Sequence, residues 1–114
     1  MRAYEVMIIL DAELEESVIQ GVINRSGEIV AASGGTVATT DKWGVRRFAY
    51  EINHQHEGFY VVLEIVTEAT DLDDLDRFLR LADETIRHKI LRLPDREAAR
   101  RGLLGGEATP ASAG

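Results

Sequence analysis

Two adjacent arginines, Arg46 and Arg47, follow Trp43 in a segment that alternates like a β-strand up to Ile52. Arginine binds phosphate and carboxylate groups through its planar fork of donors, and tryptophan is enriched at protein contacts. Charged residues are also typical of a strand at the edge of a sheet, where they prevent aggregation. The residues by themselves therefore leave two interpretations open: a surface that another chain or a phosphate backbone meets, or a protected edge.

A second group of basic residues occurs further along the chain, at Arg87, Lys89 and Arg92. In an extended strand, Arg87 and Lys89 project to one face. His88 and Arg92 project to the other face. Arg2 joins one of these faces if the last strand lies beside the first. Such side chains suit phosphate contacts, and a solvated edge is the alternative for at least one of them.

No motif for catalysis or for a cofactor is present in the sequence. His54 and His56 have the spacing of two metal ligands on a strand, but no third ligand accompanies them. The acidic run from Asp73 to Asp76 lacks the glycine and the final glutamate of a calcium loop, and it suits the first turn of a helix. The chain has no cysteine, which excludes thiolate chemistry. We therefore expect no enzyme, no metal site and no cofactor.

Length and charge set further limits on function. The 114 residues suffice for one domain with a core of its own and a tail. The formal net charge of −7 argues against binding of nucleic acid by charge alone. Basic residues are concentrated in residues 42–47 and 87–101, so one face can still carry a phosphate-binding patch. We expect RNA binding to be weak without a partner, and we expect no membrane helix, which needs about 20 apolar residues.

The periodicity of the apolar residues predicts the elements that position these groups. Strands are expected over residues 6–10, 36–53, 59–66 and 84–93. Gly44 is expected to be a bulge or a bend, and residues 54–57 a polar turn. One helix is expected to end at Gly34-Gly35, and a second to follow Thr70, a suitable N-cap. The order predicts a ferredoxin-like βαββαβ domain of the α+β class: a four-stranded antiparallel sheet with two helices on one face.

The two faces of the predicted sheet differ in what they present. The row that is expected to face the helices is Phe59, Val61, Leu63 and Ile65, and the inward row of the preceding strand is Phe48, Tyr50 and Ile52. The open face is expected to present Glu5, Met7, Ile9, Tyr60, Val62 and Glu64. Apolar surface rimmed by charge favours a partner, while cover by the tail or by self-association is the alternative. We expect the domain to span residues 1–95, and a short basic segment with a flexible tail to span residues 96–114.

Four motifs resemble the signature of the bacterial small-subunit ribosomal protein six family, and they occur in the family's order. They are Met1-Arg2-Ala3-Tyr4-Glu5, the stretch from Trp43 to Ile52, Gly58-Phe59-Tyr60 and Arg87-His88. The resemblance extends from Met1 to about Asp95. It implies a structural, non-catalytic protein of the small ribosomal subunit that binds RNA and is located in the cytoplasm, on the ribosome.

The resemblance also implies two partners: ribosomal protein eighteen, and the central domain (platform) of small-subunit ribosomal RNA. Residues expected to meet the protein partner are Lys42, Trp43, Arg46, Arg47, Phe48 and Tyr60, and those expected to contact RNA are Arg2, Arg87, Lys89 and Arg92. The rival interpretation is a ferredoxin-like homodimer that binds a small molecule and acts as a regulatory module. It accounts for the acidity and the apolar open face, but not for a tryptophan beside two arginines.

Overall fold

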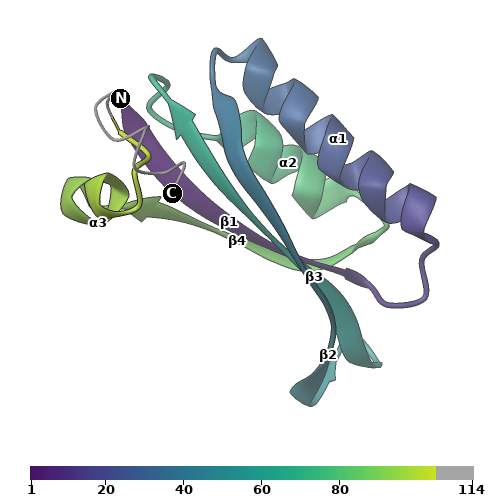
Figure 1. The fold of residues 1–114 in the computed structure, drawn as a ribbon. Coiled ribbons are helices and arrows are strands. Elements are labelled where there is room, and N and C mark those ends of the chain that lie inside the picture. Colours follow the sequence, from purple (N-terminus) through teal and green to yellow (C-terminus); the bar gives the residue numbers. More distant parts are fainter. Residues whose placement is uncertain (105–114) are drawn as a thin grey trace.

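The computed structural model describes residues 1–104 and contains one four-stranded antiparallel sheet (Figure 1). The strands are β1 (Arg2–Asp11), β2 (Thr36–Ile52), β3 (Gln55–Thr67) and β4 (Thr85–Leu93), in the spatial order β2-β3-β1-β4. The helices are α1 (Glu16–Ala32), α2 (Asp73–Leu81) and the short α3 (Asp95–Arg100). Both α1 and α2 lie on one face of the sheet, so the predicted ferredoxin-like architecture is confirmed.

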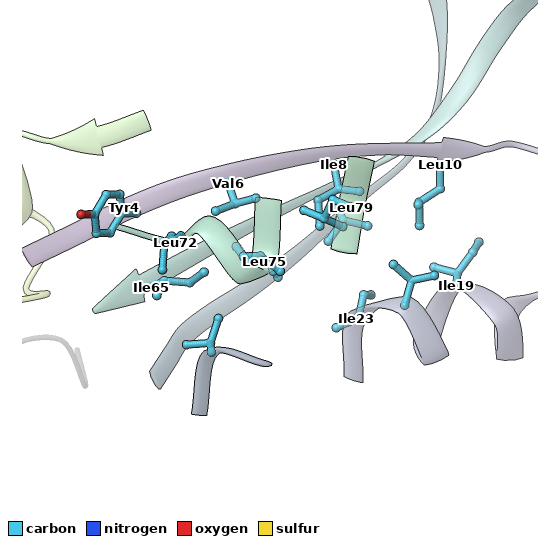
Figure 2. Packing of buried hydrophobic residues seen from close by; sticks show 14 residues of the cluster. Tyr4, Val6, Ile8, Leu10, Ile19, Ile23, Ile65, Leu72, Leu75 and Leu79 are labelled. Atoms are coloured by element: carbon cyan, nitrogen blue, oxygen red, sulfur yellow. The ribbon is translucent and has the colours of Figure 1, made fainter. Parts of the chain in front are cut away.

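The hydrophobic core lies between the sheet and the two long helices. Its strand residues alternate along β1 and β3: Tyr4, Val6, Ile8, Leu10, Val61, Leu63 and Ile65. Figure 2 shows the residues of β1 together with core residues of α1 and α2. Its helix residues recur at helical spacing: Ile19, Val22, Ile23, Val30, Leu75 and Leu79. The predicted inward row of β3 is confirmed, with Phe59 half-buried at its end. Each large side chain buried here contributes about 1.5–3 kcal/mol, which holds the two layers together.

Two glycines end α1 and return the chain to the sheet, as predicted. Gly34 has a φ of +90°, a left-handed conformation that costs glycine least. Gly35 lies against the core. A Cβ atom at Gly35 would be 2.9 Å from side-chain carbons of both Val30 and Thr67, too close for van der Waals contact. This tight turn therefore has no room for a side chain at its second position.

β2 and β3 form a hairpin whose tip extends beyond the rest of the sheet (Figure 1). The last residue of β1 pairs with Gly58, so β3 before Gly58 pairs only with β2. The chain reverses at Asn53 and His54, whose φ values of 51° and 63° are those of a type I′ turn. The turn therefore comes earlier than the predicted residues 54–57, because β3 already begins at Gln55.

The expectation that Phe48, Tyr50 and Ile52 form a buried row is wrong. No residue of β2 is fully buried, and Tyr50 is 71% exposed. The alternation of apolar residues in this strand is real, but its outer half has neither a helix nor a third strand beside it. A pattern of period two indicates which side chains share a face, and not whether anything covers that face.

The predicted N-cap of α2 at Thr70 is also wrong. Leu72 occupies the N-cap position, and the carboxylate of Asp71 accepts a hydrogen bond from the backbone N–H of Asp73 at 3.0 Å. Aspartate competes well for such local bonds, which moves the start of the helix along the chain. The backbone oxygen of Thr70 accepts a hydrogen bond from the hydroxyl of Tyr4 at 3.1 Å, which ties this loop to β1.

A carboxylate–imidazole pair joins α2 to β4. Oδ1 of Asp76 accepts a hydrogen bond from Nε2 of His88 at 2.7 Å, and Oδ2 accepts one from Arg80 at 2.7 Å. The hydrogen bond from His88, aided by the charge of Arg80, holds the pKa of Asp76 below its ordinary value of 3.8. His88 therefore faces the helix layer, where it anchors the outer strand.

The short α3 lies on the opposite face of the sheet from α1 and α2. Ala98 is fully buried against Ala3 and Leu93, and Leu103 and Leu104 pack onto the same cluster. Residues 103 and 104, within the segment predicted to contain a flexible tail, are therefore packed against the sheet. The rest of the predicted flexible tail, residues 105–114, lies outside the described residues.

Replacement of Gly35 by alanine is expected to lower the free energy of unfolding by about 1–3 kcal/mol, because the added methyl group must displace Val30 or Thr67. Gly27→Ala is the matched control, since a Cβ atom at Gly27 in α1 would have no atom from outside the local helix backbone within 4 Å. Alanine is favoured there by about 0.8–1 kcal/mol. Urea unfolding measures both variants, and a Gly35→Ala protein as stable as the control would contradict the tight packing.

Asp76→Asn is expected to lower the free energy of unfolding by about 0.5–1 kcal/mol at about pH 7. Because the pKa of Asp76 is lower in the folded protein, its contribution is fully present above 3.8 and is lost as the pH falls through the folded value. The difference between wild type and variant should therefore shrink at about pH 3. Thermal unfolding at the two pH values tests this, and a constant difference would rule out the ion pair as its source.

Candidate interaction surface

Three aromatic side chains meet on the open face of the sheet, near the tip of the hairpin. The rings of Trp43 and Tyr60 are stacked, with centroids 6.0 Å apart and 5° between their planes. The ring of Phe48 lies 6.4 Å from that of Tyr60, tilted by 58°. Both distances are those of attractive aromatic pairs. We refer to these three residues, two from β2 and one from β3, as the aromatic cluster.

Glycines at two positions allow the aromatic cluster to form. Gly44 has a φ of +91°, and the register of β2 shifts between Lys42 and Gly44, so Trp43 is the extra residue of a β-bulge. The bulge or bend predicted at Gly44 is therefore confirmed as a bulge, and it places Trp43 beside Tyr60. Gly58 lies beneath Phe48, where a Cβ atom would be 2.9 Å from the ring and 2.5 Å from Ile9. The missing side chain lets Phe48 lie close to the sheet.

Arg46 lies on the same face as the aromatic cluster. It pairs with Gly58 in the register of β2 and β3, and its guanidinium donates a hydrogen bond to the backbone oxygen of Val45 at 3.2 Å. Trp43 is 42% exposed and donates from its indole nitrogen to Asp41 at 3.1 Å. The hairpin end of the open face thus offers both aromatic rings and an exposed guanidinium to a partner.

Lys42 and Arg47 point to the helix side of β2. Nζ of Lys42 lies 3.0 Å from a carboxylate oxygen of Glu16 and 2.7 Å from the amide oxygen of Gln20, both on α1. Arg47 lines an open cleft between the hairpin tip and the loop before α1. Of the residues predicted to meet a protein partner, the structure brings together Trp43, Arg46, Phe48 and Tyr60, and places Lys42 and Arg47 elsewhere.

Two of the predicted RNA-binding residues continue this surface onto β4. Arg87 and Lys89 are exposed on the open face. Their register partners on β1 are Ile9 and Met7, respectively. On its other side, Ile9 pairs with Tyr60. Because neighbouring strands are about 4.8 Å apart, the backbone of Arg87 lies about 10 Å from that of Tyr60. The aromatic cluster and these basic residues therefore form one continuous strip across the sheet.

The other two predicted RNA-binding residues do not join this strip. Arg2 lies at the far end of β1, where its guanidinium donates to the backbone oxygen of Glu68 at 3.1 Å. Arg92 projects to the helix side of β4 and lies 3.9 Å from the carboxylate of Asp95. The structure thus separates both residues from Arg87.

The centre of the open face carries a charge cluster that the sequence analysis missed. Glu5 and Glu64 are partners in the register of β1 and β3, and Arg101 donates a hydrogen bond to each carboxylate at 2.9 Å. Arg101 also donates to Glu97 at 2.6 Å, and this bond raises the pKa of the guanidinium. Hydrogen bonds from Arg100 and Arg101 lower the pKa of Glu97 to about 2. The sequence contained one signal for this cluster: two glutamates are predicted on the same sheet face, and such a pair needs a cation nearby.

The open face therefore changes in character from one end to the other. The hairpin end is aromatic and basic, the centre holds the glutamates and Arg101, and the far end is covered by α3. Among residues 1–104, no three acidic or histidine side chains are grouped to hold a metal ion. None of the helices in that part of the chain is long and apolar enough to cross a membrane.

Comparisons with known proteins identify the family. The family model described as ribosomal protein S6 matches residues 3–92. The small ribosomal subunit protein bS6 of Carboxydothermus hydrogenoformans is 42% identical over 92 residues, which cover 81% of this chain and 96% of the relative. That of a Nocardioides species is 42% identical over 95 residues, which cover 83% and 98%. The relatives therefore match nearly their full length.

Solved structures agree with this assignment. The crystal structure of 30S ribosomal protein S6 from Thermotoga maritima superposes with a TM-score of 0.79 at 31% identity, covering 88% of this chain and 94% of that one. The P2 domain of the chemotaxis kinase CheA, at a TM-score of 0.53 and 14% identity, shares only the fold. The relatives are ribosomal proteins and not enzymes, which confirms the expected ribosomal location and non-catalytic role. The chain belongs to the ribosomal protein S6 family.

Proposed function

We propose that this protein binds the central domain, or platform, of small-subunit ribosomal RNA together with ribosomal protein eighteen. Family membership supports the proposal, since the relatives are named as proteins of the small ribosomal subunit. Within this chain, one observation carries it: the aromatic cluster and the exposed basic residues of two different strands form one strip. The residues of this strip are Trp43, Arg46, Phe48, Tyr60, Arg87 and Lys89.

The hairpin end of the strip has the chemistry of a protein interface. Aromatic residues and arginine are enriched at such interfaces and often carry most of the binding energy. Trp43 remains partly exposed even though Tyr60 stacks on it, and Tyr50, further along β2, is exposed as well. A partner that covers this end would remove a sizeable apolar area from water. We assign this end to ribosomal protein eighteen.

The β4 end of the strip has the chemistry of a phosphate-binding edge. Arg87 and Lys89 lie on a strand with one free edge, on the face opposite α1 and α2. Those two helices carry many of the acidic residues, including Glu16, Glu28, Asp73 and Asp74. RNA that approaches the open face meets the basic groups with the acidic layer behind the sheet, which reduces repulsion. The acidic remainder still limits affinity, so the partner must supply further contacts.

Arg46→Ala is expected to weaken binding of ribosomal protein eighteen about tenfold or more, because the guanidinium borders the aromatic cluster. Arg47→Ala is the matched control: the same residue type is removed one position along the strand, on the opposite face. It should leave the affinity nearly unchanged. Isothermal titration calorimetry measures both variants, and an equal or larger loss with Arg47→Ala would refute the assignment of the open face.

Binding to a central-domain RNA fragment is expected to be salt-sensitive and to require ribosomal protein eighteen. Each phosphate contact contributes about 0.7–0.9 to the slope of log affinity against log salt, so Arg87→Ala and Lys89→Ala should each reduce the slope by about that amount. Arg25→Ala removes the same charge from α1, where it pairs with Glu28, and should leave the slope unchanged. No binding even with the partner, combined with a stable homodimer, would favour the small-molecule-binding module instead.

A further inference from the structure

Two glutamates face each other at the centre of the sheet. Glu5 and Glu64 are direct partners in the register of β1 and β3. Side chains in such positions have Cβ atoms about 5 Å apart, and like charges there are destabilising. Only 25% and 20% of these two side chains are exposed, so water screens the repulsion poorly. This arrangement needs a cation that comes from outside the two strands.

Arg101, the residue that follows α3, supplies that cation. A single nitrogen, Nη1, lies 2.9 Å from Glu5 and 2.9 Å from Glu64 and so bridges the two carboxylates. Nε lies 2.6 Å from Glu97, which holds the guanidinium in its orientation. The neighbouring Arg100 differs, because its side chain is 72% exposed and pairs with Glu97 alone among the described residues.

We propose that Arg101 is the internal counter-ion of the Glu5–Glu64 pair, and that it thereby latches α3 and the chain up to Leu104 onto the open face. Docking of α3 and neutralisation of the two glutamates are then a single event. If α3 leaves the sheet, the apolar contacts of Ala98 are lost and both carboxylates are left facing each other. The latch goes beyond the proposed binding of RNA and ribosomal protein eighteen and does not depend on it.

Other groups near the pair do not replace Arg101. The hydroxyl of Thr39 on β2 donates to Glu64 at 2.8 Å but carries no charge. Lys89 on β4 and Asp41 on β2 are diagonal neighbours of the two glutamates on the same face. Both are exposed, and they carry opposite charges, so together they add no net positive charge.

The counter-ion role predicts an unusual response to pH. In Arg101→Met, mutual repulsion should raise the pKa of one carboxyl group of the pair in the folded protein. A carboxyl group whose pKa is raised by folding binds its proton more tightly in the folded state, so stability rises as the pH falls through the folded pKa. The variant should therefore gain stability on mild acidification, whereas the wild type should not.

The test is urea unfolding of the full chain at about pH 7 and about pH 5. Arg101→Met is expected to lower the folding equilibrium constant about tenfold or more at the higher pH, and to regain part of it at the lower pH. Arg100→Met, which removes the same charge one residue earlier, should change little at either pH. The double variant Arg101→Met/Glu64→Gln should recover most of the loss, and it keeps the test informative if the single variant does not fold.

Hydrogen exchange reports on docking separately from global stability. The backbone N–H of Leu103 donates to the backbone oxygen of Ala98 at 2.9 Å and is expected to exchange faster in Arg101→Met. Unchanged protection of Leu103 would overturn the latch. A stability loss that is equal at both pH values and is not relieved by Glu64→Gln would overturn the counter-ion role, since it would point to lost packing of the arginine stem alone.

Discussion

Burial of β1 on both faces is the constraint on which the rest of the structure depends. The strand pairs with β3 on one side and β4 on the other, and one of its rows lies against α1 and α2. Its second row is covered in three different ways along its length. Ala3 is covered by α3, Glu5 is neutralised by Arg101, and Ile9 lies against Gly58 of the hairpin. The positions of α3, Arg101 and the hairpin are therefore set by the contacts that they make with the open face of β1.

The unequal length of the strands leaves the outer part of the β2–β3 hairpin uncovered. β2 and β3 outgrow β1, so their outer halves have neither a neighbouring strand nor a helix layer. Side chains that would be core residues in a wider sheet, such as Tyr50, remain at the surface there. The alternation of a single strand then sends Arg46 to one face and Arg47 to the other. The two adjacent arginines therefore lie on opposite faces of the sheet.

The layered fold also reconciles a net charge of −7 with the proposed binding of RNA. Many acidic side chains lie on α1 and α2, while Arg87 and Lys89 lie on the far side of the sheet. Coulomb interactions between exposed charges are screened within about 10 Å at moderate salt, so the two faces act nearly independently. The glutamates that do lie on the open face are compensated within the protein, by Arg101.

The sequence alone was sufficient for the order of the four strands and two long helices, the helix-facing row of β3 and the family. These features follow from local periodicity and from motifs of a few residues, such as the alternation along β3 and the glycines that end α1. An irregularity at Gly44 was predictable for the same reason, since glycine inside a strand often marks a bulge or a bend. The start of α2 was not, because the carboxylate of Asp71 binds the backbone N–H of Asp73 and Leu72, which has no capping side chain, takes the N-cap position.

The tertiary structure alone decided which charged residues act together. Arg101 and Glu5 are 96 positions apart, and no local pattern relates them. Lys42 and Trp43 are adjacent, yet they lie on opposite faces of the sheet. Lys42 contacts Glu16 of α1, whereas the bulge places Trp43 on the open face. The physical reason is the same in both cases: register and strand length set which side chains face each other and which are covered. Those quantities depend on pairing between segments that are remote in the sequence.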